Sequence, residues 1–135
     1  VSTAKNGVSN KLNSNGTPSG LCSIVERIGN DQPMGMRFIG RVPTGEIVRP
    51  EADSPENSTI GDYILTRILR LAGLESGINR GGDVDTYARY IYLHGTNEEY
   101  LIGTPASHGC IRMRNTDILS LYSLVSCGTP VLISS

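Results

Sequence analysis

The sequence predicts a mainly β protein of one domain with one or two short helices. Its apolar residues gather in short runs that Gly or Pro interrupts, which is typical of strands and turns. Only one segment, near the C-terminus, combines helical periodicity with signals for both helix ends. A chain of 135 residues is long enough for one hydrophobic core and too short for a second. We therefore expect residues 1–135 to form a single domain with one active site.

The N-terminal half is predicted to consist of strands joined by loops. Residues 1–20 are dense in Ser, Asn, Gly, Thr and Pro, so they predict a strand end followed by a long loop. β-branched and apolar residues in 21–29, 34–42 and 46–50 predict three strands. The acidic segment 51–58 is interpreted as an exposed loop in preference to an acidic binding patch.

The run at residues 62–73 is compatible with either a strand or a helix. Its β-branched residues and the Gly at its end favour a strand. Apolar residues in and beside the run also recur at helical spacing. These residues are Ile60, Ile64, Ile68 and Leu71. Periodicity alone leaves both predictions open.

Residues 86–93 predict a strand buried on both faces, because aromatic and β-branched residues crowd into a few positions. Side chains alternate between the two faces of a regular strand, so Tyr90, Tyr92 and His94 would share one face. We expect the imidazole of His94 to lie at the strand end beside aromatic rings, a position suited to a functional site.

The C-terminal segment predicts a helix and a closing strand. Asn115 can cap a helix over residues 116–126, and Gly128 can end it. The apolar stripe of this helix comprises Ile118, Leu119, Tyr122 and Val125. Residues 129–134 predict the final strand.

The composition argues against two classes of protein. The formal net charge of −1 shows no surplus of Lys and Arg, which carries binding to nucleic acid. No stretch approaches the roughly 20 apolar residues of a transmembrane helix. We expect neither a nucleic-acid partner nor a membrane span in this chain. The cations are mostly Arg, whose fork suits carboxylates.

Both histidines and one of the three cysteines lie within residues 94–110. A thiol attacks as thiolate, and a nearby imidazole is a usual means of activating it. Cys110 is therefore a candidate nucleophile with two candidate bases. His94 could return on a neighbouring strand, whereas His108 would share a face with Cys110 in extended backbone. The residues alone leave the choice open.

Two glycines lie beside these candidates. Gly109 precedes Cys110, and the amides of these two residues could form an oxyanion hole without a Cβ in the way. A carbonyl near Gly95 could accept a hydrogen bond from the second ring nitrogen of His94 and fix its tautomer.

Structural roles for the same residues are the alternative. Cys is among the most buried residue types, and a His on a strand is often a satisfied core group. A zinc site would have only three ligands in this window, at a spacing that matches no zinc-finger pattern. We expect no metal and no cofactor.

The window resembles the catalytic signature of the L,D-transpeptidase family, also called the YkuD domain. In that family a His-Gly pair precedes a Ser-His-Gly-Cys block by a little over a dozen residues. This chain has His94-Gly95 and then Ser107-His108-Gly109-Cys110. The segments VSTAKNG and GTPSG before the site, and IRMRN and GTPVLI after it, also resemble the family, so the resemblance covers most of the chain.

The resemblance implies a sandwich-like, mostly β catalytic domain and a strand at residues 62–73. The family's domain usually opens with a strand hairpin before the VSTA-like segment. Either this version dispenses with the family's first strands or the sequence is a trimmed fragment. The chain begins at Val1 with no visible signal peptide and no initiator Met, so an address could have been removed.

For the catalytic residues, the resemblance implies Cys110 as the nucleophile and His94 as its general base. The Gly95 carbonyl would orient the imidazole. His108 becomes a supporting residue that shapes the pocket or the oxyanion environment, beside Gly109.

Three further residues are predicted to bind substrate. Ser107 would contribute to the pocket next to the nucleophile, and Tyr92 would line it. Many relatives carry Asn where this chain has Arg112. We expect Arg112 to bind a substrate carboxylate, in preference to forming a structural ion pair.

The resemblance implies acyl transfer on peptidoglycan stem peptides in cell wall biogenesis, which maintains cell shape. The product would be a 3→3 cross-link, with L,D-carboxypeptidase activity or peptide binding without turnover as alternatives. It also implies carbapenem β-lactams as inhibitors and a location in the bacterial periplasm or cell envelope. Cys22 and Cys127 would then be left to form a disulfide or to remain two buried free thiols.

Overall fold

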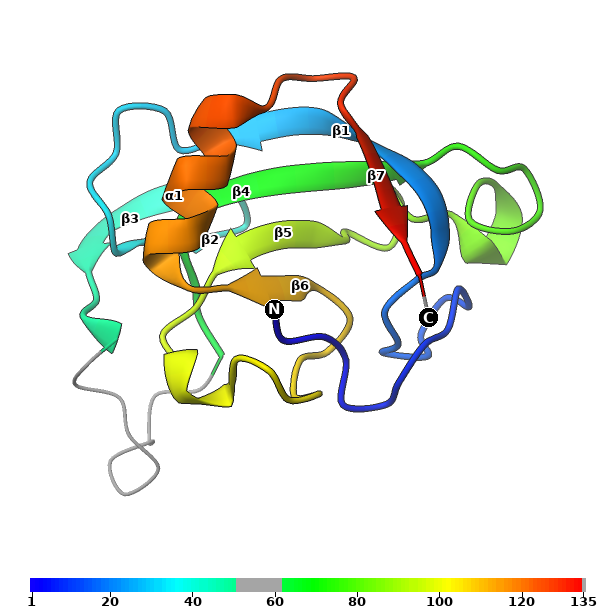
Figure 1. Ribbon diagram of the computed structural model, residues 1–135, viewed down its shortest axis with the longest axis horizontal. Helices are drawn as coiled ribbons and strands as arrows, with labels where there is room; N and C mark the ends of the chain where they lie inside the picture. Colours follow the sequence, from blue (N-terminus) through cyan, green and yellow to red (C-terminus); the bar gives the residue numbers. More distant parts are fainter. Residues whose placement is uncertain (51–61, 135) are drawn as a thin grey trace.

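The computed structural model describes residues 1–50 and 62–134. Within these residues seven strands form one hydrogen-bonded sheet, accompanied by helix α1 and the short 3-10 helices η2 and η3 (Figure 1). The strands are β1 (Gly20–Ile28), β2 (Met36–Ile39), β3 (Val42–Ile47), β4 (Ile64–Gly73), β5 (Tyr92–Gly95), β6 (Ile111–Met113) and β7 (Pro130–Ile133). The helices are α1 (Asn115–Leu124), η2 (Gly82–Val84) and η3 (Glu99–Leu101). The mainly β fold is therefore confirmed.

Strand β4 is the centre of the sheet. Strands β2 and β1 pair with successive parts of one edge of β4, both antiparallel, and β5 pairs antiparallel with the other edge. β7 continues the sheet beyond β1, β3 continues it beyond β2, and β6 pairs with β5 in parallel. The run at residues 62–73 is thus a strand, and pairing on both edges explains its nearly continuous burial.

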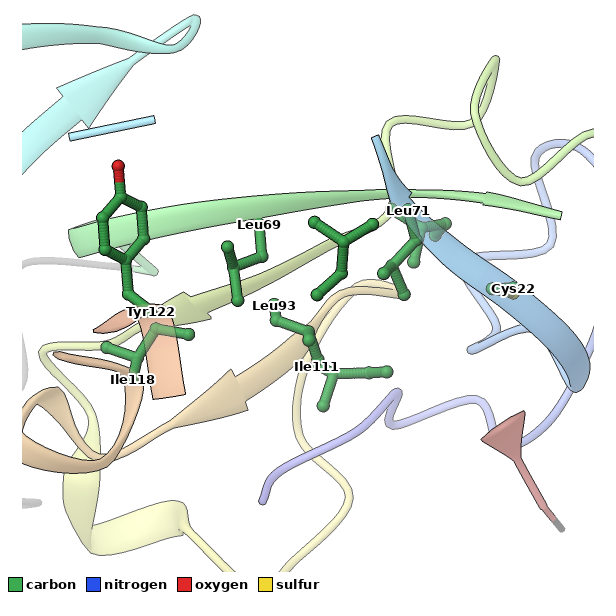
Figure 2. Close-up of a cluster of buried hydrophobic side chains, with 9 residues drawn as sticks. Cys22, Leu69, Leu71, Leu93, Ile111, Ile118 and Tyr122 are labelled. Atoms are coloured by element: carbon green, nitrogen blue, oxygen red, sulfur yellow. The ribbon is translucent and has the colours of Figure 1, made fainter. Parts of the chain in front are cut away.

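The main hydrophobic core lies between α1 and one face of the sheet, where α1 packs against β4 and β5 (Figure 1). Figure 2 shows the cluster of nine buried residues, to which β4 and β5 contribute Leu69, Leu71 and Leu93. A second cluster on the opposite face joins the hairpin β2–β3 to the sheet through Phe38 and Ile68. Ile68 and Leu69 are neighbours in sequence, so their separation into two clusters follows from strand alternation.

The predicted helix is present, but Asn115 does not cap it. The cap residue is Arg114, and Asn115 is the first helical residue. The Asn115 side chain accepts from Thr66 Oγ1 and donates to the Thr96 carbonyl at 2.8 Å, which anchors α1 to the sheet. A carboxylate from elsewhere takes the capping role, since Glu99 Oε2 accepts the Asn115 N–H at 2.7 Å.

The predicted strand at residues 86–93 is mostly wrong. β5 begins only at Tyr92, and the five residues before Ile91 form turns. Tyr90 has a φ of +56°, which breaks the extended backbone. Tyr92 and His94 therefore share a face, and Tyr90 does not belong to that row. The expected burial on both faces is also wrong for this part of the segment, because Tyr87 and Tyr90 are exposed.

The other sequence predictions have mixed outcomes. The first predicted strand and the last are β1 and β7, and the segments at 34–42 and 46–50 correspond to the hairpin of β2 and β3 with shifted ends. The acidic segment 51–58 lies outside the described residues.

All three cysteines are free thiols, with Cys22 buried and Cys127 exposed, so the disulfide is absent. Of the described helices, none has the length and apolar character needed to span a membrane.

Candidate active site

The parallel pairing of β5 and β6 brings His94 and Cys110 to the same face of the sheet. Leu93 pairs with Ile111, and both belong to the core beneath α1. Their neighbours along each strand must point the other way. Accordingly, Tyr92 belongs to the second cluster and Cys110 packs against it. Residues 16 positions apart in sequence therefore face the same side of two adjacent strands.

His94 is buried and held in a defined tautomer. Its side chain lies in β5, and the residue is 2% exposed. Nδ1 lies 2.6 Å from the Gly95 carbonyl, which can only accept, so Nδ1 carries the proton and Nε2 has the lone pair. Burial lowers the pKa of His94 below its usual value, more than the Gly95 hydrogen bond raises it. The ring is thus a neutral imidazole suited to accept a proton.

Only glycine fits at position 95, because neighbouring atoms leave no room for a side chain. A Cβ at this position would approach the Leu65 carbonyl to 2.6 Å and would also meet the side-chain oxygen of Asn115. Neither atom can retreat easily, because one belongs to the central strand and the other anchors α1. The carbonyl that orients His94 is therefore held by close packing of three elements.

The thiol of Cys110 lies in a turn-and-strand cradle formed by residues 90–92. It donates to the Tyr90 carbonyl at 3.4 Å and accepts from the Tyr92 N–H at 3.4 Å. Burial raises the pKa of Cys110 to about 11, and the Tyr92 N–H together with the charges of Arg89 and Arg112 offsets this only in part. The resting group is a neutral thiol.

No hydrogen bond joins the His94 ring to the Cys110 sulfur within residues 1–50 and 62–134. The thiol proton is directed to Tyr90 instead. In unliganded sites catalytic hydrogen bonds are often long and form only when substrate binds. The structure therefore places the two groups on one face without the contact that proton transfer needs.

The Ser107 side chain forms hydrogen bonds within the turn that contains Cys110. Its hydroxyl donates to the Cys110 carbonyl at 2.6 Å and accepts from the Gly109 N–H at 3.2 Å. Ser107 is also buried, so its predicted contact with substrate is corrected to an internal bracing role. The Gly109 amide is occupied by this bond, which leaves the predicted oxyanion hole with the Cys110 amide alone unless the hydroxyl rotates away.

Gly109 itself is needed for the shape of this turn. Its φ of +130° is a conformation that side chains rarely adopt. Its carbonyl accepts from Thr17 Oγ1 at 3.0 Å, and Thr17, in the loop before β1, is buried. The loop before the first strand thus supports the Cys110 turn directly.

His108 is exposed, unlike His94. Its Nδ1 lies 3.6 Å from Asp62 Oδ2, and 79% of its side chain is accessible. It lines a pocket of about 280 Å³ together with Arg89, Tyr90 and Ile91 and the loop around Leu12. The two histidines thus differ in environment, and the supporting role of His108 stays a prediction.

Arg112 does not point to a substrate site. The residue is fully buried, and its Nη1 donates to Glu98 at 2.7 Å and to Asp62 at 2.9 Å. Its Nη2 donates to Ser2 Oγ at 3.1 Å. A guanidinium with these partners has no accessible face for a substrate carboxylate, so the prediction is corrected to the structural ion pair. The reason is burial, which sequence position alone did not reveal.

Tyr92 lines the site through its backbone, while its ring is buried. The side chain belongs to the second cluster, and its hydroxyl accepts from Arg41 Nη1 at 3.0 Å. The predicted direct contact with substrate is therefore corrected as well: Tyr92 links Arg41 to the Cys110 cradle.

Sequence reasoning missed four charged residues of the site. Asp62 and Glu98 neutralise Arg112, and Arg89 holds the N-terminal loop by donating to Ser9, Ser14 and Gly16. Arg41 reaches Tyr92 from the β2–β3 turn. No spacing signal could have found them, because each acts across a long stretch of chain.

The raised pKa of Cys110 predicts how its reactivity depends on pH. Alkylation by iodoacetamide, a small neutral reagent, requires the thiolate. We expect the rate at Cys110 to rise about tenfold per pH unit from pH 7 and to level off near 11. Peptide mass mapping of a Cys127→Ser variant would measure it without the exposed thiol. A plateau already at neutral pH would contradict a neutral resting thiol.

Comparisons with known proteins show which family the chain resembles. The family model described as the L,D-transpeptidase catalytic domain, YkuD, matches residues 1–133. The chain is 41% identical over 118 residues to a putative L,D-transpeptidase YkuD of Bacillus subtilis, covering 83% of the chain and 57% of that protein. It is 49% identical over 49 residues to a probable L,D-transpeptidase YbiS of Escherichia coli K12, covering 33% of the chain and 16% of that protein.

The chain also resembles solved structures. An L,D-transpeptidase from Mycobacterium smegmatis aligns over 99% of this chain and 46% of that chain, with 17% sequence identity and a TM-score of 0.45. The chain thus spans a little over half the length of the Bacillus subtilis relative and a smaller part of the Escherichia coli one.

Proposed function

The chain belongs to the L,D-transpeptidase catalytic domain family, YkuD, and on this premise we propose that it transfers acyl groups between peptidoglycan stem peptides through Cys110. The product is a 3→3 cross-link. The whole of residues 1–135 acts as one catalytic domain.

The first half-reaction forms an acyl-enzyme. His94 Nε2 takes the thiol proton while Sγ attacks the carbonyl at the L-centre of a diamino-acid residue. The tetrahedral intermediate collapses to a thioester, and His94 returns the proton to the departing terminal D-amino acid. For this step the Cys110 side chain must turn from the Tyr90 carbonyl toward the imidazole.

The second half-reaction releases the peptide. The side-chain amine of another stem attacks the thioester, gives its proton to His94 and leaves Cys110 as thiol again. Water in place of the amine would give an L,D-carboxypeptidase. The outcome depends on whether the acceptor site positions an amine and excludes water.

One observation supports the assignment of the base above the others. The Nδ1 contact of His94 with the Gly95 carbonyl, 2.6 Å long, leaves Nε2 unprotonated on the face that Cys110 shares. The lowered pKa of His94 keeps this nitrogen available at neutral pH. The exposed His108 has neither the fixed tautomer nor the burial.

The proposal is tested by incubating the protein with a purified tetrapeptide muropeptide and analysing the products by mass. A dimer lacking one terminal D-amino acid is expected. A carbapenem should add its mass to the protein, and the Cys110→Ala variant should show neither product nor adduct.

The other outcomes each have a distinct meaning. A shortened monomer with no dimer under any condition would contradict cross-linking and favour the carboxypeptidase. Absence of both products and of any adduct would favour a non-catalytic peptidoglycan-binding module. The substrate locates the proposed reaction in the bacterial periplasm or cell envelope, as part of cell wall biogenesis.

A further inference from the structure

We propose that Arg41 binds a carboxylate of the donor stem peptide and thereby positions the scissile carbonyl at Cys110. This inference rests on the acyl transfer proposed above. It replaces the role that the sequence assigned to Arg112, whose guanidinium is buried and already paired with two carboxylates.

Arg41 lies in the turn between β2 and β3, over the face of the sheet that carries Cys110. The hairpin reaches this face through Met36 and Phe38, which pack in the cluster that Cys110 contacts. The backbone of Arg41 has a φ of +69°, and the residue is half-buried. Its side chain therefore leaves a tight turn beside the candidate site.

The Arg41 guanidinium contacts Tyr90 and Tyr92, the two residues whose backbones bind the Cys110 thiol. Nη1 donates to the Tyr92 hydroxyl at 3.0 Å, and the guanidinium carbon lies 5.4 Å from the centre of the Tyr90 ring. The backbones of the same two residues hold the Cys110 thiol. The Arg41 guanidinium therefore contacts the side chain of Tyr92, whose backbone N–H binds the sulfur. A peptide bound at Cys110 could reach the guanidinium from there.

The charge of Arg41 is not neutralised by the surrounding part of the chain that the structure describes. Arg37, Arg70 and Arg112 each form an ion pair with a carboxylate in residues 1–50 and 62–134, whereas Arg41 forms none. Glu26 acts on Arg41 only at longer range, since its Oε1 is bound by Arg70 and Tyr87.

A guanidinium without an ion-pair partner can bind a carboxylate of a ligand. One Nη1 donor is used by Tyr92, and the remaining N–H groups of the fork can bind a carboxylate with two parallel hydrogen bonds. A donor stem offers such a group at the terminal D-amino acid and, where the diamino-acid side chain bears one, at that side chain. Both sources have the same chemistry, and amidated peptides distinguish them.

The experiment measures peptide binding by calorimetry in the Cys110→Ala protein, so that turnover does not interfere. The probes are a tetrapeptide stem with free carboxylates, its C-terminal amide, and its side-chain amide. We expect Arg41→Gln to weaken binding of the free peptide roughly 10- to 100-fold, the usual size of charged hydrogen bonds. The affinity of Arg41→Lys, which keeps the charge but not the planar guanidinium, should lie between those of the parent and Arg41→Gln.

The amide that removes the recognised carboxylate should bind equally to the Arg41→Gln protein and its parent. Arg37→Gln is the matched control, because it removes the same charge from the same hairpin but from a guanidinium already paired with Glu46. Equal effects of Arg41→Gln and Arg37→Gln, or an undiminished effect with both amides, would overturn the inference.

The test is independent of the proposed reaction. Acyl-enzyme formation is measured separately by mass in the protein with Cys110 intact. An acyl-enzyme that forms while Arg41→Gln binds the free peptide like the parent would refute the role of Arg41 and leave acyl transfer standing. Weaker binding in Arg41→Gln without any acyl-enzyme would refute acyl transfer and retain carboxylate recognition.

Discussion

Turnover of a stem-peptide donor is expected to disappear in Cys110→Ala and to fall roughly 10²- to 10⁴-fold in His94→Gln. Removal of the thiol takes away the nucleophile. Glutamine at position 94 keeps an amide that can approach the Gly95 carbonyl, but it cannot accept and return a proton. Initial rates from the mass-based product assay would measure both losses.

His108→Gln separates the two histidines. His108 is largely exposed, so its loss should lower turnover far less than the loss of His94. Thermal unfolding of all three variants would show whether the fold is intact, since His94 is buried and Cys110 packs against the second cluster. A greater loss in His108→Gln than in His94→Gln would reverse the assignment of the base.

The free energy of unfolding is expected to fall by about 3–5 kcal/mol in Arg112→Gln, because the substitution leaves two carboxylates without their buried partner. Arg112 is fully buried and donates to both Asp62 and Glu98. These contacts join β6 to segments 50 and 14 residues away in sequence. Urea unfolding followed by circular dichroism would measure the change.

Arg37→Gln provides the comparison for this prediction. The Arg37–Glu46 ion pair is partly exposed, so its loss should cost only about 0–1 kcal/mol. If Arg112 instead served substrate binding, Arg112→Gln would unfold at the same urea concentration as Arg37→Gln and would raise KM. That result would restore the role first inferred from the sequence.

Local patterns predicted most of the fold. Turn residues and apolar runs located β1, the hairpin, β7 and α1, because propensity and periodicity report whether a segment can form an element. They failed at residues 86–90, where an aromatic run forms turns, and at Asn115, whose side chain anchors the helix while Glu99 caps it. In both cases contacts with distant segments outweighed the local preference.

The sequence also predicted the candidate catalytic residues, but it did not decide which of the two histidines acts as the base. One thiol and two imidazoles within 17 residues indicated a nucleophile with a base, and the signature resembled one family. Which histidine is buried and which is exposed depends on the pairing of β5 with β6. The pKa directions of His94 and Cys110 follow from the same burial.

By itself, then, the sequence determined the residue types available for catalysis and the elements that carry them, since both depend on neighbours along the chain. The tertiary structure alone decided that Arg112 is a buried ion-pair partner and that Arg41, which donates to the Tyr92 hydroxyl, has no carboxylate partner among residues 1–50 and 62–134. Charge pairing and burial depend on groups that folding brings together from far apart in sequence, and no local pattern records those distances.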